Sequence, residues 1–182
     1  MTRETKALAK NLLVPMKAVI TDIKKETEDV FTYSLKLNGK DKLSCAPGQF
    51  NMVGLAGVGE APISFSSIES DAFFKHTIRA VGRVTRSFTG LSIGDELHVR
   101  GPYGKGWPVD DARGGDVLLV AGGLGLAPLR PVIHRILKNR GDYGNVTLVF
   151  GARDPGGVLF VDEIKKWEEK IKVILCVDEV PR

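Results

Sequence analysis

The segment Val117–Pro131, VLLVAGGLGLAPLRP, combines local signals that predict the architecture around it. Its first five residues are all apolar, which is typical of a buried strand. Gly122, Gly123 and Gly125 follow, and glycines allow a sharp turn with room for a ligand against the backbone. We therefore expect a buried strand over 117–121 that ends in a tight glycine turn.

A helix is predicted to follow this turn, over residues 126–140. Pro128 and Pro131 are expected in its first turn, where a missing N–H costs little. A strand, a glycine turn and a helix N-terminus can bind a diphosphate, because free N–H groups and the helix dipole point at one spot. The spacing is G-x-G-x-x-P rather than G-x-G-x-x-G, so the segment alone is equally compatible with a turn that binds nothing.

The sequence downstream repeats the pattern of apolar strand and amphipathic helix. Strands are predicted over 146–150 and 173–177, with a helix over 160–170 between them whose Ile164 and Trp167 face inward. Alternating strands and helices indicate a parallel sheet with right-handed crossovers. Three strands are few for a nucleotide-binding α/β domain, so we expect this domain to be incomplete and the chain to be a fragment.

The sequence upstream has a different pattern, with short β-rich segments and one small helix. The helix is predicted over 84–91, with Thr85 or its neighbour as N-cap. Short strands at close spacing are typical of a small antiparallel β-barrel. The predicted barrel strands cover 17–23, 30–37, 49–55, 61–67, 73–81 and 95–100.

A stretch rich in Gly, Pro and charge, 101–116, separates the two patterns and is expected to be a linker. The predicted organisation is therefore an N-terminal arm (1–14), a barrel domain (15–112) and an incomplete α/β domain (113–182).

Composition excludes several classes of function. The net charge of +4 is spread over 182 residues, without the basic stripe and interleaved aromatics that nucleic-acid binding needs. No apolar run approaches the roughly 20 residues of a membrane span, and the N-terminus lacks an apolar signal core, so we expect a cytoplasmic protein. Cys45 and Cys176 are far apart and the three histidines are isolated, so no metal site is expected.

Several short motifs follow one another along the chain in a characteristic order. Each is common alone, and their succession is specific. They are Pro47-Gly48-Gln49-Phe50, Ala61-Pro62-Ile63-Ser64, Gly82-Arg83-Val84-Thr85, Gly101-Pro102-Tyr103-Gly104, the glycine turn with Pro128, and Gly151-Ala152-Arg153. In this order they resemble the ferredoxin reductase-like flavoproteins. The resemblance implies a Greek-key barrel that binds FAD, followed by an α/β domain that binds NAD or NADP.

Two longer stretches, Gly57–Ser67 and Ala121–Pro131, are similar to one branch of this family. That branch comprises the flavin (gamma) subunits of hydrogenases and sulfhydrogenases, to which the electron-transfer subunit of dihydroorotate dehydrogenase and the flavin subunit of anaerobic sulfite reductase are related. The resemblance implies electron transfer between NAD(P)H, FAD and an iron–sulfur partner subunit. A [2Fe–2S] cluster is expected only in a missing C-terminal segment or in the partner, because the branch's four-cysteine segment and C-G-P strand are absent from the sequence.

The resemblance also assigns roles to particular residues. Ser64, the expected catalytic residue, would hydrogen-bond the flavin near N5, and Thr85 would present N–H groups to the FAD diphosphate. Arg79 would either reach a phosphate or remain an exposed strand charge. Asp178 would accept a ribose 2′-hydroxyl and favour NAD, whereas Arg153 favours NADP. The full set of expected cofactor-binding residues is Ala61, Pro62, Ile63, Ser64, Ile78, Arg79, Ala80, Gly82, Val84, Thr85, Gly122, Gly123, Gly125, Leu126, Pro128, Arg153 and Asp178.

Two residues depart from the family pattern. Ala61 stands where the family often has an Arg on the FAD diphosphate, and Ile63 stands where many members stack a Tyr on the flavin. Loss of one charge-assisted hydrogen bond, worth roughly 1.5–3 kcal/mol, would weaken FAD binding by about one to two decades. These departures leave open a flavin-poor docking or regulatory module of the same fold. A stand-alone NAD(P)H:ferredoxin or flavin reductase is the other alternative.

Overall fold

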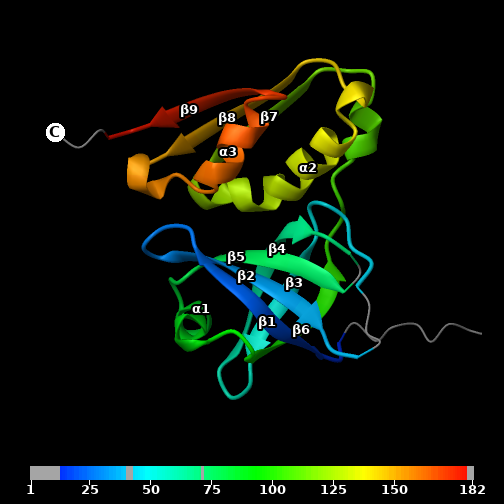
Figure 1. The fold of residues 1–182 in the computed structure, drawn as a ribbon. Coiled ribbons are helices and arrows are strands. Elements are labelled where there is room, and N and C mark those ends of the chain that lie inside the picture. The colour runs from blue at the N-terminus through cyan, green and yellow to red at the C-terminus, as the bar shows by residue number, and fades with distance from the viewer. Residues whose placement is uncertain (1–12, 40–42, 71, 180–182) are drawn as a thin grey trace, which may run out of the picture.

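The computed structural model describes residues 13–39, 43–70 and 72–179, so most of the predicted N-terminal arm lies outside the described residues. The chain forms two layers that follow the two sequence patterns (Figure 1). A closed six-stranded barrel forms one layer, and a three-stranded parallel sheet with two helices forms the other. The helices α2 (Leu126–Lys138) and α3 (Val161–Trp167) lie between the sheet and the barrel.

The barrel confirms the predicted antiparallel architecture. Its strands close in the order β1-β2-β5-β4-β3-β6, and all neighbouring strands are antiparallel. Because β3, β4 and β5 are consecutive and β6 returns beside β3, the connection is a Greek key. The strands are β1 (Met16–Lys25), β2 (Val30–Leu37), β3 (Phe50–Leu55), β4 (Gly59–Ile68), β5 (Phe73–Arg79) and β6 (Glu96–Tyr103).

Alternation along the strands divides core residues from residues that face the second layer. On β5, Phe74 and Ile78 are buried in the barrel core. Thr77 and Arg79 are the residues on either side of Ile78, so their side chains point outward. On β4, Phe65 is in the core, and Ser64 and Ser66 on either side of it point outward by the same rule. We call this outward side of β4 and β5 the outer face. Further core residues are Ala18, Ile20, Tyr33, Leu35, Val53, Phe88, Leu97 and Val99.

The small helix of the barrel domain is shorter than predicted. Helix α1 covers Arg83–Ser87 and passes into a 3-10 turn over Phe88–Gly90. Gly82 is its N-cap, so the prediction of Thr85 or its neighbour as N-cap was wrong for Thr85. Thr85 instead lies at the third helical position, where its hydroxyl accepts from the N–H groups of Val81 at 3.2 Å and Gly82 at 3.0 Å. This backward reach fixes the turn that enters the helix.

The second layer is the predicted parallel sheet, and its strands lie in the order β7-β8-β9. Its strands are β7 (Val117–Gly122), β8 (Val146–Ala152) and β9 (Lys172–Val177). Pro128 lies in the first turn of α2 as predicted, but Pro131 lies inside the helix. Pro131 lacks the N–H that would pair with the Ala127 carbonyl, and burial of the helix offsets that loss.

The parallel strands are buried on one face only. Leu119 and Ala121 on β7 and Leu148 on β8 pack toward the helices. Leu118 and Val120 point the other way and are 66% and 65% exposed. The prediction that these strands are buried was therefore wrong for one face, because both α2 and α3 cover the side toward the barrel (Figure 1). Apolar sequence alone does not reveal how many faces of a strand have a covering layer.

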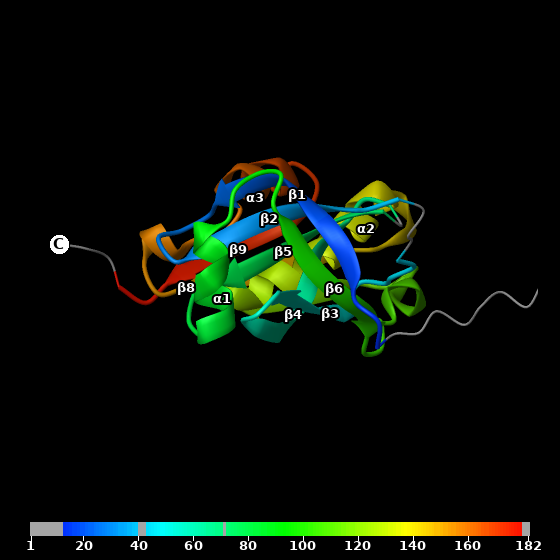
Figure 2. The same cartoon turned by 90° about the horizontal axis from the view of Figure 1, so that it is seen from below.

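Specific contacts hold the two layers together. Arg130 on α2 is 6% exposed, and its Nη1 donates to the carbonyl oxygen of Ser66 on β4 at 2.7 Å. Val30 of the barrel belongs to the buried core of the second layer. Lys24 Nζ lies 3.5 Å from Asp162 Oδ2 at the start of α3. The outer face of the barrel is thus set against the N-terminal part of α2. In both views α1 lies on the side of the carboxyl ends of the parallel strands (Figures 1 and 2).

Candidate functional site

A hollow of about 590 Å³ lies between the outer face of the barrel and the glycine turn. Its walls are mainly apolar, with a few polar groups from β4, β5 and α1. A concave, mostly apolar hollow of this size suits a flat organic ring system. Its lining residues are Ala61, Pro62, Ile63, Ser64, Thr77, Ile78, Arg79, Val81, Thr85, Leu124, Gly125, Ala127 and Pro128.

The glycine turn forms one wall of this hollow. Gly123 has a φ of +49°, a left-handed conformation that a residue with a side chain adopts only at a cost. A Cβ built on Gly122, Gly123 or Gly125 would meet no atom within 4 Å. The turn therefore opens onto free space. The Leu126 N–H at the start of α2 donates to the Gly123 carbonyl oxygen, so the N–H groups left without a helical partner are those of the 3-10 turn over Gly123–Gly125 that precedes α2. This is the shape and polarity that a diphosphate requires.

A larger cleft of about 1310 Å³ adjoins the first hollow. Gly122 and Gly123 line it from the turn, and Arg153 and Asp178 line it from the carboxyl ends of β8 and β9. Ligands of open parallel sheets bind at this edge. Arg79 lines both spaces and marks where they meet.

Arg79 has an acidic neighbour within the cleft. Its Nε lies 3.3 Å from Asp29 Oδ2, and the Arg79 side chain is 41% exposed. Asp29 also lines the larger cleft. The two readings of Arg79 that the sequence left open are both compatible with this geometry, since an exposed pair can open toward a phosphate.

Ser64 is held in place from inside the barrel. His76 Nδ1 lies 2.8 Å from the Ser64 carbonyl oxygen, which can only accept, so Nδ1 carries the proton. His76 Nε2 then accepts from Asn51 Nδ2 at 3.1 Å. Burial lowers the pKa of His76 to about 4, so the ring is neutral at pH 7. A neutral core histidine thus fixes the backbone of the residue predicted to face the flavin.

Arg130 also belongs to a charged cluster behind the outer face. Its Nη2 and Nε donate to the Glu163 carboxylate at 2.7 and 2.8 Å, and His134 Nε2 lies 3.0 Å from the same group. Burial alone would raise the pKa of Glu163, but the hydrogen bonds from His134 and Arg130 outweigh it and lower the pKa to about 2. The Glu163 carboxylate is therefore ionised over the whole physiological pH range. Its contacts with Arg130 and His134 join α3 to α2.

The predicted site residues separate into those that reach these spaces and those that do not. Ile78 lines the smaller hollow, and Ala80 lines the larger cleft. Gly82 and Val84 line neither space. Leu126 is fully buried in the core of the second layer, so only its backbone can face a ligand. The predicted residues that line one or both spaces are Ala61, Pro62, Ile63, Ser64, Ile78, Arg79, Ala80, Thr85, Gly122, Gly123, Gly125, Pro128, Arg153 and Asp178.

Sequence reasoning missed several lining residues. Thr77 follows from the alternation that placed Arg79 outward, because both lie on the same side of β5. Asp29 reaches the larger cleft from the turn between β1 and β2, and Thr89 reaches it from the 3-10 turn that follows α1. Nothing in their local sequence marks them. Arg83, which lines neither space, was also given no role. Its Nη2 donates to the Val58 carbonyl at 2.9 Å, which holds a cation over the turn between β3 and β4.

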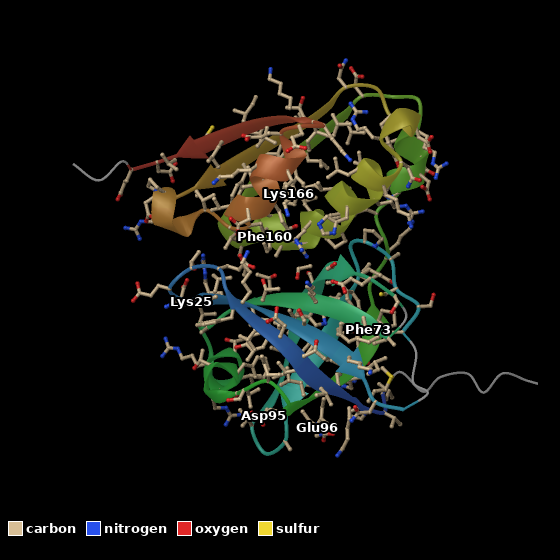
Figure 3. All side chains as sticks on the ribbon, in the orientation of Figure 1. Lys25, Phe73, Asp95, Glu96, Phe160 and Lys166 are labelled. Atoms are coloured by element: carbon tan, nitrogen blue, oxygen red, sulfur yellow. The ribbon has the colours of Figure 1, made fainter. Side chains whose placement is uncertain are left out.

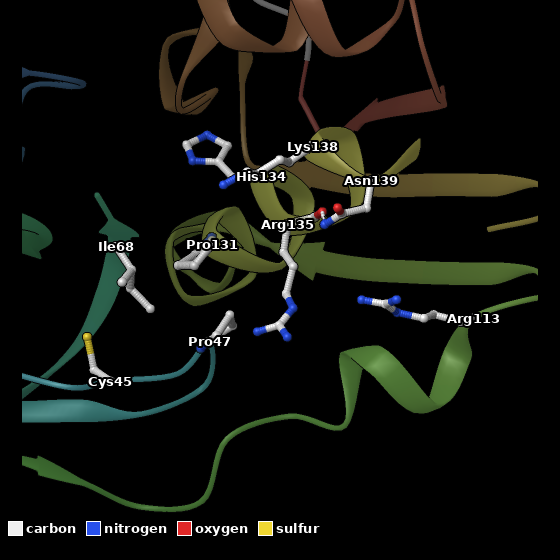
Figure 4. Close-up of a pocket in the computed structure, with 9 residues that line it drawn as sticks. All are labelled: Cys45, Pro47, Ile68, Arg113, Pro131, His134, Arg135, Lys138 and Asn139. Atoms are coloured by element: carbon white, nitrogen blue, oxygen red, sulfur yellow. Dashed lines mark hydrogen bonds between the residues drawn. The ribbon is translucent and has the colours of Figure 1, made fainter. Parts of the chain in front are cut away.

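A third hollow, of about 360 Å³, lies elsewhere between the barrel and α2 (Figure 4). Arg113, Arg135 and Lys138 line it together with Cys45 and Pro131. Arg113 is paired with Asp110 and Asp142, and Arg135 is paired with Asp110. Its basic charge is thus largely compensated, and it includes none of the predicted site residues.

The smaller hollow and the larger cleft fit the two groups that the sequence predicts. The apolar walls around Ser64 suit an isoalloxazine ring, and the open glycine turn suits a diphosphate. Within the described ranges, no group of three or more His, Cys, Asp or Glu side chains is placed to hold a metal ion. The same residues include no helix long and apolar enough to cross a membrane.

Comparison with known proteins agrees with this geometry. Residues 17–107 match the oxidoreductase FAD-binding domain family, and residues 119–179 match the oxidoreductase NAD-binding domain family. The chain belongs to the FAD- and NAD-binding oxidoreductases of the ferredoxin reductase-like fold.

Among curated proteins, the chain is similar to sulfhydrogenase 1 subunit gamma of Pyrococcus furiosus. The two are 42% identical over 163 residues, which cover 86% of this chain and 56% of the relative. A probable dihydroorotate dehydrogenase B (NAD(+)) electron transfer subunit of Methanopyrus kandleri is 36% identical, over 87% of this chain and 57% of its own. The chain thus spans about half the length of the curated relatives it matches.

Solved structures show the same fold. An NADH-dependent reduced ferredoxin-NADP oxidoreductase, described with flavin-based electron bifurcation, superposes with a TM-score of 0.76 at 27% identity, over 91% of this chain and 60% of the other. The ferredoxin reductase of carbazole 1,9a-dioxygenase superposes with a TM-score of 0.79 at 22% identity, over 92% of this chain and 51% of the other. The second likeness concerns the fold alone.

Proposed function

We propose that this chain is the dinucleotide-handling part of a flavoprotein electron-transfer subunit. It would move electrons between NAD(P)H, FAD and an iron–sulfur partner of the hydrogenase or sulfhydrogenase type. The observation that carries the proposal is the junction at Arg79, where the flavin-sized hollow opens into the cleft at the glycine turn. Two dinucleotides bound there would meet face to face.

When bound, FAD would accept a hydride from NAD(P)H and release the electrons one at a time. The residues of the chain have only to bind and orient the two groups. Ser64 would hydrogen-bond the flavin from β4, and Gly122–Gly125 would hold the diphosphate of NAD(P)H. Asp178 supports NAD and Arg153 supports NADP, since both line the cleft where the adenosine ribose would lie.

The proposed partner follows from the relatives. Sulfhydrogenase gamma subunits and electron-transfer subunits of dihydroorotate dehydrogenase are named as parts of larger enzymes, and we infer the same for this chain, with a [2Fe–2S] cluster in the partner or in a further segment. We also propose a cytoplasmic location, which Cys45 and Cys176 support because they are not joined in a disulfide. The domain division at 112/113 is supported by the limits of the two matched families.

Uptake of FAD tests the proposal directly. The purified chain, mixed with FAD, should quench flavin fluorescence and retain a yellow colour after gel filtration. The bound flavin should then be bleached by NADH or NADPH without oxygen. A chain that takes up no FAD at any practical concentration would refute the proposal and favour the docking or regulatory module. The reduced flavin could instead pass its electrons to free flavin or ferredoxin as efficiently as related reductases do. That result would favour a stand-alone reductase.

Ala61 offers a gain-of-function version of this test. Ala61 lines the flavin hollow, so Ala61→Arg should add one charge-assisted bond to the FAD diphosphate. That bond would tighten FAD binding by about 10- to 100-fold. Ser92→Arg adds the same charge beside Asp95, at the end of the barrel remote from the second layer (Figure 3). This control should leave the Kd of FAD unchanged, and equal tightening by both variants would contradict the assigned position of FAD.

A further inference from the structure

One buried guanidinium joins the barrel to both helices of the second layer. Arg130 on α2 donates from Nη1 to the carbonyl oxygen of Ser66 on β4 at 2.7 Å. Its Nε and Nη2 donate to the two carboxylate oxygens of Glu163 on α3, at 2.8 and 2.7 Å. Its Cζ lies 5.1 Å from the centre of the ring of Phe160, the residue directly before α3. Because the guanidinium is planar and rigid, these contacts fix both its position and its orientation.

This arrangement is unfavourable for a contact that only holds two layers together. The Arg130 side chain is 8% exposed and that of Glu163 is 24% exposed, and desolvation of a buried ion pair can exceed the attraction within it. Phe160 has a φ of +55°, a left-handed conformation that is unfavourable for a bulky residue. Apolar side chains of similar volume would join the layers without these costs. They would lack a directed bond to the backbone of β4.

The acceptor of this directed bond lies at an irregularity of β4. Strands β4 and β5 pair at Phe65 and again at Ser67, so Ser66 between them is the extra residue of a β-bulge. A bulge takes one residue out of the regular ladder and re-aims its groups. Here the bulged residue is fully buried, and its carbonyl oxygen accepts from Arg130. The bulge of β4 and the guanidinium of α2 therefore fit one another.

The bond ties together two segments that line the flavin-sized hollow. Ser66 lies two residues beyond Ser64 on β4, and Ser64 lines the hollow from the barrel. Arg130 lies about one helical turn beyond Ala127 on α2, and Ala127 lines the hollow from the other side. Helix α2 also begins at the glycine turn, which lines the dinucleotide cleft. The separation of the two walls is therefore set directly beside the hollow.

Other contacts between the layers are less able to fix this separation. Lys24 and Asp162 form an ion pair at 3.5 Å whose side chains are 45% and 77% exposed, and exposed pairs contribute little. Val30 packs into the core of the second layer through apolar contact, which has no preferred direction. Arg130 supplies the directed contact that these two do not.

We propose that Arg130 is a positioning residue for hydride transfer, which it serves by setting the distance between the flavin and the nicotinamide. The inference rests on the proposed function. In that step the nicotinamide C4 loses one hydrogen with its bonding electron pair, and the flavin N5 gains both. The reacting atoms have to approach to about 3–3.5 Å, and a misplacement of about 1 Å lowers the rate about 100-fold. Arg130 lines neither the hollow nor the cleft, so it acts through their walls and not by binding.

Anaerobic stopped-flow reduction of the FAD-loaded chain by NADH, or by NADPH where the wild type prefers it, tests this role. The dependence of flavin bleaching on nucleotide concentration separates the limiting rate from the Kd of the nucleotide. The double variant Arg130→Met with Glu163→Leu replaces the ion pair by apolar contacts that retain stability, but it loses the bond to Ser66. Its limiting rate should fall about 100-fold, while the Kd values of FAD and nucleotide should change little. Arg135→Met removes an arginine of the same helix that pairs with Asp110, and this matched control should react at the wild-type rate.

Two further variants separate position from stability. Glu163→Gln weakens the ion pair and should lower stability, but Arg130 keeps its bond to the Ser66 carbonyl, so the limiting rate should stay at the wild-type level. Arg130→Lys keeps a charge beside Glu163 but lacks the planar fork that reaches both partners at once, so hydride transfer should slow about tenfold. Arg130→Lys decides the question where the double variant does not fold, and a wild-type rate in this variant overturns the role.

Absorbance spectroscopy gives a readout that does not depend on turnover. A nicotinamide stacked on a flavin produces a weak charge-transfer band at long wavelength. The 1,4,5,6-tetrahydro analogue of the nucleotide binds in its place but transfers no hydride. Added to the FAD-loaded chain, this analogue should produce the band in wild type, Arg135→Met and Glu163→Gln. The band should be lost in the double variant, although calorimetry still detects the bound analogue.

The outcomes separate this inference from the proposed function. A wild-type chain that takes up no FAD, or whose flavin is reduced by neither NADH nor NADPH, overturns the proposed function and the role of Arg130 with it. A wild type that is reduced no faster than the folded double variant overturns the role of Arg130 alone. Rates that follow the thermal stability of the variants, with Glu163→Gln as slow as the double variant, overturn it as well. Slow reduction of the double variant together with fast reduction of Glu163→Gln supports it.

Discussion

Acid should destabilise the barrel through one buried histidine. His76 is fully buried, and its pKa is lowered to about 4, whereas an unfolded chain has a histidine pKa of about 6.5. Above pH 6.5 neither state binds the proton and stability is unaffected. Between pH 6.5 and 4 the unfolded state binds the proton and the native state does not, so stability falls as the pH falls. The difference of about 2.5 pH units corresponds to about 3 kcal/mol.

The stability lost through His76 can be separated by pH from that lost through the carboxylates. Glu163, whose pKa is lowered to about 2, contributes stability that is lost only below about pH 4.5, where the unfolded carboxyl begins to bind a proton. Between pH 6.5 and 4.5 the His76 contribution should therefore dominate, with a slope approaching 1.4 kcal/mol per pH unit.

Denaturant titrations at a series of pH values measure this slope. Trp167 is buried in the second layer, so Trp167→Phe leaves Trp107 as the fluorescence reporter of the barrel domain. His76→Gln can still donate to the Ser64 carbonyl but does not titrate, and it should flatten the slope. His98→Gln, on the outside of β6, is the matched control and should keep it. The reasoning is refuted if His76→Gln retains the full slope.

Three further predictions concern the interface and the dinucleotide cleft. Arg130→Met leaves the Glu163 carboxylate without its main cation and should lower the free energy of unfolding by denaturant by about 3 kcal/mol. Adding Glu163→Gln to Arg130→Met should restore part of that stability. If the stability losses of the two single variants instead add up in the double variant, the pairing is contradicted. Gly123→Ala should cost only about 1 kcal/mol of stability for its positive φ, but calorimetric titration should show NADH affinity reduced more than tenfold, because the new Cβ points into the open space; an equal affinity would place the ligand elsewhere. Asp178→Asn should raise NADPH affinity relative to NADH by about tenfold, and an unchanged ratio would remove Asp178 from nucleotide choice.

Much of the fold was predictable because it depends on local periodicity. The alternation along β5 and the apolar run of β7 are determined by residues two apart and by short windows, which the sequence displays directly. The glycine turn was predictable for the same reason, since only glycine adopts the conformation of Gly123 without cost. The order of the motifs along the chain then assigned both predicted domains to one family.

The errors have a common physical origin in what covers each element. Leu118 and Val120 are as apolar as buried strand residues, and their exposure depends on the placement of α2 and α3 on the opposite face. Pro131 was expected at a helix start, and it is tolerated within α2 because the helix is held by packing rather than by every hydrogen bond. Contacts such as that between Arg130 and Ser66 join residues distant in the chain, and no local pattern marks them.

The two-residue period of β5 carries a consequence for how this protein can change over evolution. Phe74, His76 and Ile78 build the inside of the barrel, while Thr77 and Arg79 line the flavin-sized hollow on its outer face. Insertion of one residue within the strand would exchange the two sets, leaving a threonine in the core and a histidine against the flavin. Lineages of this chain should therefore accept substitutions in β5 far more readily than single-residue insertions or deletions, and length variation should be confined to the turns at its ends.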